Sequence, residues 1–187
     1  MMRLLSTFLA LAAGLTFAEA QPADREALWK EVAEAEKKGL PKTAAAKLQL
    51  IYDSALQDDR HAEAIKALAK RITHEGAVQG NKPEEKITRL QAELEKTPAE
   101  ARPLLQSILG HWYWQYFRAN HYRFLQRTAT AQPLGDDFTT WDLPRLYREI
   151  DLHFTNALAD GRLKTIPTTD FTDLLTKPTL PEKYRPT

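Results

Sequence analysis

The side chains best suited to hold a ligand lie in an aromatic segment, residues 111–127, which contains seven of the seventeen aromatic residues of the chain. Helical spacing places Trp114 and Arg118 on one face of this segment, where the guanidinium can lie over the indole as a cation–π pair. Such a pair could contact a sugar or another polar ligand. The same two residues also fit a wet boundary between helices, because tryptophan commonly buries its ring while its N–H finds a partner.

A second candidate site is the acidic pair Asp136 and Asp137, in a segment rich in turn-forming residues, 129–140. We expect a loop there, of a length typical of functional or mobile loops. Its carboxylates could bind calcium, but the alternating oxygen ligands and internal glycine of a calcium loop are absent. A sugar-binding interpretation would combine Trp114 and Arg118 with residues 132–140.

Groups that could carry out catalysis are scarce. After the first twenty residues the only serines are Ser54 and Ser107, neither in a nucleophile elbow, and the chain has no cysteine. No histidine pair has the four-residue spacing that places two imidazoles on one helical face, so each is expected to cap or border a helix. The five histidines are His61, His74, His111, His121 and His153. This inventory predicts that the chain is not an enzyme and holds no cofactor or metal.

The elements that must position these residues are helices. Glycine is scarce, alternating β-branched runs are almost absent, and apolar residues recur at three- and four-residue spacing. The fold prediction is all-α, with antiparallel helical hairpins, loosely tetratricopeptide-like, packed on a central aromatic-rich helix. A second copy of the first hairpin at the repeat period is not found, which argues against a true repeat array.

The first three helices are predicted from their apolar stripes. The first ends at Gly39, which can adopt the left-handed conformation, and Pro41 begins the second. Asp58 and Asp59 are expected to cap the third. The three stripes are Leu28, Val32 and Ala35; Ala44, Leu48, Ile51, Tyr52 and Ala55; and Ile65, Leu68 and Ile72.

The fourth helix begins at Pro83, and the aromatic helix follows it. Thr97 to Glu100 fits a capping box, and Pro103 predicts a kink or a short separate turn. Four aromatic residues, Trp112, Tyr113, Tyr116 and Phe117, are expected in the core.

A last long helix is expected to start at a cap provided by Thr140 or Asp142. Its predicted apolar face consists of Leu143, Leu146, Tyr147, Ile150, Phe154 and Leu158.

The N-terminus has the three parts of a secretory signal: a basic start, an apolar run and the small-residue exit Ala18-Glu19-Ala20. We expect residues 1–20 to be a signal peptide cleaved between Ala20 and Gln21, which places the protein in the periplasm or outside the cell. Without cysteine it cannot be a lipoprotein. Residues 21–176 should form one helical domain and 177–187 a proline-rich connector.

Charge limits the kinds of partner. The formal net charge is +1, and basic and acidic residues are mixed along the predicted helices. A basic block of the kind that binds nucleic acid is absent. The apolar run near the N-terminus is too short for a transmembrane helix. We therefore expect no nucleic-acid partner and no membrane span.

Short motifs follow one another over nearly the whole chain after the signal. They are, in order, Leu28-Trp29-Lys30; Gly39-Leu40-Pro41-Lys42 with Ala44-Ala45-Ala46; Ile51-Tyr52; Ile65-Lys66-Ala67-Leu68; Trp112-Tyr113-Trp114 with Tyr116, Asn120 and Tyr122; Arg127-Thr128; and Thr140-Trp141-Asp142-Leu143. In this order and spacing, they resemble the N-terminal helical region of bacterial α2-macroglobulin-family proteins.

This resemblance implies a module of an exported endopeptidase inhibitor, a protease trap in which a bait segment is cut and macroglobulin domains close on the protease. The chain lacks the cysteine of the family's thioester, and no run of strands could form a macroglobulin β-sandwich. We therefore expect a truncated chain that does not inhibit alone. Its partners would be the missing downstream macroglobulin-like domains, with proteases reached only through them.

An alternative function remains open: a self-contained exported adaptor that binds another protein through the concave side of its first helical hairpins.

Overall fold

The computed structural model describes residues 24–80, 82–125, 135–159, 161–171 and 174. The predicted cleavage site at Ala20 and Gln21 and the tail 177–187 lie outside these residues. The described residues form six α-helices and three 3-10 helices, without a β-strand, which confirms the all-α prediction. The elements are α1 Arg25–Lys37, α2 Pro41–Gln57, α3 His61–Val78, α4 Pro83–Leu94, α5 Arg102–Leu125, η1 Phe138–Thr140, α6 Leu143–Leu158, η2 Arg162–Thr165 and η3 Thr168–Phe171.

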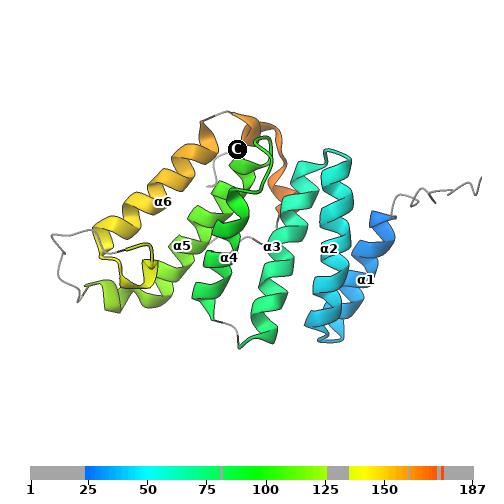
Figure 1. Ribbon diagram of the computed structural model, residues 1–187, viewed down its shortest axis with the longest axis horizontal. Helices are drawn as coiled ribbons and strands as arrows, with labels where there is room; N and C mark the ends of the chain where they lie inside the picture. The colour runs from blue at the N-terminus through cyan, green and yellow to red at the C-terminus, as the bar shows by residue number, and fades with distance from the viewer. Residues whose placement is uncertain (1–23, 81, 126–134, 160, 172–173, 175–187) are drawn as a thin grey trace, which may run out of the picture.

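Helices α1, α2 and α3 stand side by side at one end of the molecule (Figure 1). Asp24 caps α1 by accepting from the N–H groups of Glu26 and Ala27. Gly39 ends the α1–α2 turn with a φ of 66°, as predicted, and Pro41 begins α2. The predicted stripes of the three helices are buried, apart from the partly exposed Tyr52.

The predicted capping of α3 by Asp58 and Asp59 is wrong. Arg60 is the N-cap residue of α3, and its side chain makes no capping hydrogen bond. The Asp58 carboxylate instead accepts from Arg25 at 2.5 Å, and Asp59 adopts a φ of 55° to make the turn. An ion pair with α1 therefore competes successfully with the local cap.

The predicted capping box at Thr97 is also wrong. The Thr97 hydroxyl donates to the carbonyl of Glu93 at 2.7 Å and so satisfies the end of α4 rather than the start of α5. Helix α5 begins at Arg102, which puts Pro103 in the first turn, where its missing N–H would have had no helical partner. Pro103 therefore needs no kink. A short separate turn does precede the helix, as predicted, because the N–H groups of Ala101 and Arg102 both donate to the carbonyl of Pro98, at 3.0 and 3.2 Å.

The core is an aromatic cluster around Tyr113, which is fully buried. Its ring centroid lies 5.2 Å from that of Phe138 in an edge-to-face arrangement, 6.1 Å from that of Trp141 and 5.5 Å from that of His153. Phe138 belongs to η1, so residues 138–140 are not loop as predicted. Of the four aromatic residues predicted in the core of α5, only Phe117 is partly exposed.

Helix α6 is capped by Asp142, which accepts from the N–H of Arg145 at 2.9 Å. Its predicted apolar face is partly wrong, because Tyr147, Phe154 and Leu158 are 41%, 38% and 62% exposed. Helix α6 packs mainly on α5, and this contact covers only the centre of its wide apolar arc. The buried residues of α6 are Leu146, Ile150, His153 and Ala157.

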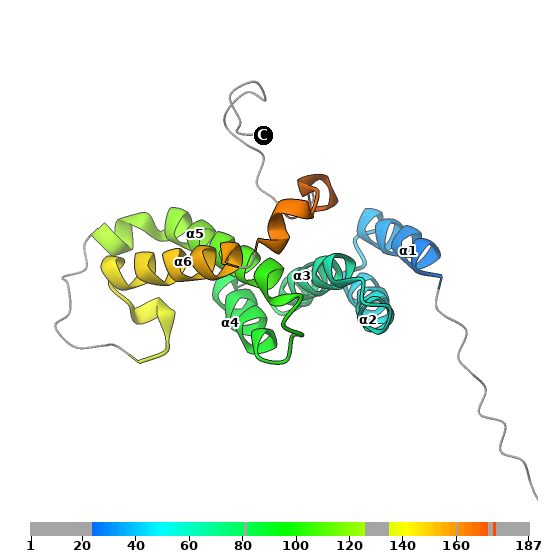
Figure 2. The same cartoon turned by 90° about the horizontal axis from the view of Figure 1, so that it is seen from above.

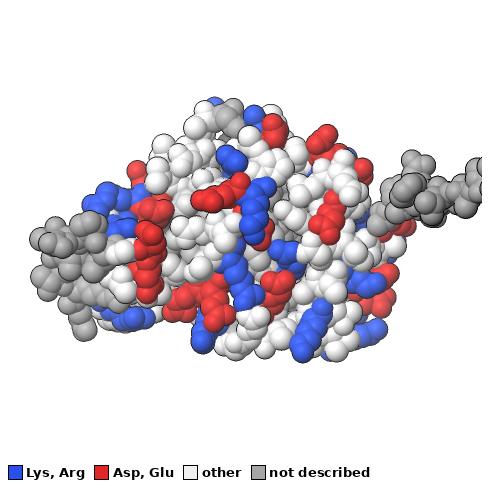
Figure 3. Space-filling model, viewed as in Figure 1, with Lys and Arg blue, Asp and Glu red and all other residues white. Residues whose placement is uncertain are grey.

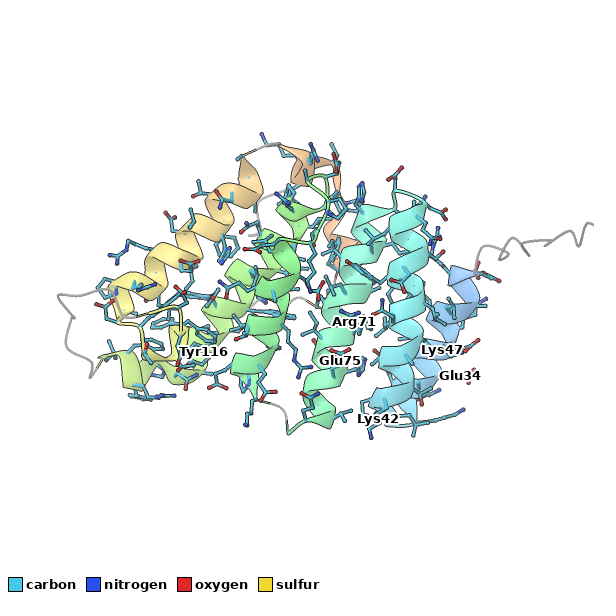
Figure 4. The ribbon with its side chains drawn as sticks, in the orientation of Figure 1. Glu34, Lys42, Lys47, Arg71, Glu75 and Tyr116 are labelled. Carbon is cyan, nitrogen blue, oxygen red and sulfur yellow. The ribbon has the colours of Figure 1, made fainter. Side chains whose placement is uncertain are left out.

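Charges of both signs alternate over the face shown in Figure 3. Arg71 and Glu75 lie along α3 (Figure 4), and Glu75 also accepts from Arg89 of α4 at 3.3 Å. Such partly exposed pairs contribute little stability individually. Packing therefore has to hold the helices together.

We predict that Tyr113→Ala lowers the free energy of unfolding by about 3–5 kcal/mol, because it leaves a cavity in the aromatic core. Tyr113→Phe should cost about 1 kcal/mol, since it removes only the hydrogen bond that the hydroxyl donates to Gln91. The control is Tyr122→Ala, at a position 72% exposed, which should change stability by less than about 0.5 kcal/mol. Urea unfolding measures all three; equal losses for the two alanine variants would contradict this account.

Candidate functional site

The exposed apolar side chains of the described chain are concentrated on α5 and α6. Ten large apolar residues are exposed, and seven belong to these two helices. The hairpin lies at the end of the molecule opposite α1, as both views show (Figures 1 and 2). The seven residues are Trp114, Tyr122 and Leu125 on α5 and Tyr147, Leu152, Phe154 and Leu158 on α6.

Four of these residues form what we call the outer aromatic face: Trp114, Tyr147, Phe154 and Leu158. The Trp114 ring centroid lies 6.5 Å from that of Tyr147, with the planes at 29°. Tyr147, Phe154 and Leu158 follow one another at seven- and four-residue spacing, which puts them on one side of α6. The face is therefore shared by both helices of the hairpin.

The predicted cation–π pair between Trp114 and Arg118 is not formed. The Trp114 ring contacts Phe117, at 5.4 Å between centroids, and Tyr147. Arg118 is exposed on α5, and no cation–π contact of its guanidinium is found within the described residues. The polar-ligand site built on these two residues therefore lacks the geometry that suggested it.

A cleft of about 250 Å³ lies between α5, α6, η2 and η3. Phe154 lines this cleft and also belongs to the outer aromatic face. An ideal Cβ at Gly110 would lie 3.2 Å from the Phe154 ring, so a residue without a side chain permits the close approach of α6 to α5. The lining includes Leu104, Ile108, Phe154, Leu163, Ile166 and Phe171, with Ser107 and His111 as the polar members.

Lys86 of α4 does not line this cleft, but its charge acts on His111 at the polar end. Burial, and secondarily the charge of Lys86, lower the pKa of His111, so its imidazole is neutral at pH 7. The Lys86 ammonium lies 4.8 Å from the centroid of the Trp112 ring, and burial lowers the pKa of Lys86 as well. No carboxylate in the described part of the chain forms an ion pair with Lys86.

His153 lies in the core rather than at a helix boundary as predicted. Its ring stacks on Tyr113, its Nδ1 hydrogen-bonds Gln106, and only 4% of the residue is exposed. Burial lowers the pKa of His153 to about 4. The Glu149 carboxylate is 3.5 Å from Nε2, but it does not overcome the cost of burying an imidazolium.

The two acidic candidates have different environments. Asp137 caps η1 by accepting from the N–H and the hydroxyl of Thr139 at 3.0 and 2.7 Å, and these bonds lower the pKa of its carboxyl. Asp136 is exposed beside an open hollow that Glu95, the C-cap residue of α4, also lines. Within the described residues, no group of three potential metal ligands is close enough to hold an ion. Asp137 is thus explained as a cap.

Comparisons with protein-family models, curated proteins and solved structures found no match. Among the helices that the structure describes, none combines the length and apolarity needed to cross a bilayer.

Sequence reasoning brought Trp114 to the candidate surface but missed the cleft beside it. Ser107 and His111 come from α5, and Leu163 and Ile166 from a segment about fifty residues later, so only tertiary packing brings them together. One signal was present in the sequence: Gly110, an isolated glycine within an apolar helix, which indicates a close approach by another element.

The burial of His153 predicts that acid destabilises the fold. Because the pKa of His153 is near 4 when folded and near 6.5 when unfolded, the unfolded chain binds the extra proton as the pH falls through this window. Its contribution amounts to about 3 kcal/mol, fully lost below about pH 4. Glu149, whose pKa burial raises, titrates in the opposite sense and offsets part of the loss.

The measurement is urea unfolding of the wild type and of His153→Phe at pH 7 and pH 4. The variant keeps an aromatic ring against Tyr113 but cannot be protonated, so it should lose less stability on acidification. Identical losses in the two proteins would show that His153 is not the group responsible.

Proposed function

We propose that this chain is a non-catalytic helical docking module of an exported, periplasmic or secreted protein. Its specific role would be the N-terminal module of an α2-macroglobulin-like endopeptidase inhibitor. The outer aromatic face packs against a macroglobulin-like domain of the full-length protein. The module lacks a bait region and a thioester, and it reaches proteases only through such domains.

The observation that supports docking is the contrast between the two ends of the row of helices. Helix α1 presents water-facing ion pairs, Lys30 with Glu26 at 2.8 Å and Lys38 with Glu34 at 3.4 Å. The opposite end presents the outer aromatic face, with Trp114 and Tyr147 each about two-fifths exposed. Helical stacks need a polar terminal element to stay in solution, so an apolar end favours a further protein element packed against it.

The size of the outer aromatic face suits the centre of a protein interface. A large aromatic side chain can bury 150–250 Å². At the observed exposures, the four residues together offer roughly 300 Å² of apolar surface. A standard interface covers about 800 Å² on each partner, with an apolar centre and a polar rim. The exposed Asp151, four residues after Tyr147 and three before Phe154, lies on the same side of α6, and Thr155 is exposed beside it, so polar groups adjoin the apolar ones.

The resemblance supplies the identity of the partner in this proposal. Trp114 belongs to the same matching motif as the core residues Tyr113 and Tyr116, and the core residue Trp141 belongs to another. The face that needs a partner is therefore held by residues that carry the likeness to the macroglobulin family.

The first experiment reads the gene beyond the codon for Thr187. A continuing frame that encodes macroglobulin-like β-sandwiches supports the proposal. A stop codon with no such frame downstream overturns the macroglobulin assignment.

The second experiment tests the surface. We predict that replacing Trp114, Tyr147 and Leu158 together with serine weakens association with the adjoining macroglobulin-like segment, expressed separately, by at least tenfold. The matched control replaces three other exposed apolar residues with serine and should leave the affinity within about twofold of the wild-type value. They are Leu40 just before α2, Leu50 within α2 and Val78 at the end of α3. Calorimetric titration measures affinity, and urea unfolding confirms that both variants fold. Equal effects of the two triple variants on the affinity would contradict the proposal that the outer aromatic face is the docking surface.

The alternative proposal, a self-contained adaptor, is favoured by an open hollow of about 700 Å³ beside the start of α3. Trp29, Arg60, His61 and Lys66 line it, and Figure 2 shows α1 and η2 on the same side of α3. If the chain is such an adaptor, Arg60→Glu should abolish binding of its partner protein. The serine variant of the outer aromatic face should still bind that partner. The macroglobulin-module proposal predicts the opposite pattern.

A further inference from the structure

The cleft between α5, α6, η2 and η3 has the composition of a site for a small amphiphilic molecule. Most of its lining is aliphatic or aromatic, and Ser107 and His111, one helical turn apart on α5, supply its polar groups. Small-molecule sites are usually concave and apolar, with a few polar groups that orient the ligand. The cleft therefore has one polar end, and the rest of its lining is apolar.

The volume of the cleft limits the size of its ligand. A cavity of about 150 Å³ lined by aliphatic and aromatic side chains holds benzene. In proportion, a cleft of about 250 Å³ takes about ten heavy atoms. A linear molecule of this size, such as octanoate, would place its chain among Ile108, Phe154 and Ile166.

The charge near the polar end selects the head group. Lys86 is half-buried against the Trp112 ring, and no carboxylate of the described chain forms an ion pair with it. His111 lies close enough to Lys86 to feel its charge. A partly desolvated cation without an ion-pair partner is stabilised by an incoming anion, whereas a second cation would be repelled. The head group that fits is a carboxylate.

We propose that this cleft binds a medium-chain carboxylate, with its hydrocarbon chain between α5, α6 and the two 3-10 helices and its carboxylate at Ser107 and His111, within electrostatic reach of Lys86. The hydroxyl of Ser107 donates a hydrogen bond to the carboxylate, and Lys86 supplies the longer-range attraction. This site does not rest on the docking proposal, since it needs only residues of this chain.

The test is calorimetric titration of the purified chain with octanoate, octan-1-ol and octylammonium, each below its aggregation concentration. Octanoate should bind at one site and at least tenfold more tightly than octylammonium, with octan-1-ol between them. Absence of octanoate binding, or equal binding of the two ions, overturns the proposal.

Two variants separate the apolar and charged contributions. Lys86→Met keeps a long side chain against Trp112 and should weaken octanoate binding about tenfold while leaving octan-1-ol unchanged. Its matched control is Lys96→Met, a change at a largely exposed lysine of the α4–α5 connection, which should alter neither. If the two methionine variants changed octanoate affinity equally, Lys86 would have no specific part in binding the carboxylate.

Ile166→Trp should fill the cleft and abolish binding of both octanoate and octan-1-ol. Should this variant fail to fold, Ser107→Leu provides the same test from the α5 side. Unchanged binding in a folded variant of either kind would place the ligand elsewhere.

Discussion

The burial of Tyr113 is the interaction on which the rest of the structure depends. Its ring meets Phe138 of η1, Trp141 at the entry to α6 and His153 within α6, while its hydroxyl bonds Gln91 of α4. One side chain of α5 thus contacts both α4 and the η1–α6 region. Because the described surface is held only by partly exposed ion pairs, the orientation of the α5–α6 hairpin follows from this cluster.

The same cluster determines which parts of the hairpin remain exposed. Once Leu146, Ile150 and His153 turn toward α5, the flanking residues Tyr147 and Phe154 must lie at the edge of the contact. The stacking of His153 on Tyr113 fixes which side of α6 faces α5. The outer aromatic face and the cleft are both consequences of that orientation. The core, the outer aromatic face and the cleft thus arise from a single packing arrangement.

Desolvation links the polar groups of the hairpin. His153 and His111 are both held neutral by burial, and Lys86 is half-buried over Trp112. His153 and Lys86 each contact an aromatic ring, His111 hydrogen-bonds Gln115, and in all three removal from water raises the cost of charge. The difference lies in access: His153 is enclosed in the core, whereas His111 lines a cleft that a ligand can enter.

The sequence by itself determined the helices and most of their buried stripes, because apolar periodicity is a local property that Leu28, Leu48 and Ile65 express wherever they fold. It also identified Gly39 and Pro41 as the α1–α2 turn, and it offered Thr140 or Asp142 as the cap of α6, of which the structure uses Asp142. Only the tertiary structure decided the competing local choices: Asp58 pairs with Arg25 instead of capping α3, and Thr97 closes α4 instead of opening α5. It likewise brought His153 into the core and left Phe154 beside the cleft, since periodicity defines an apolar arc but the neighbouring helix decides which part of that arc is covered.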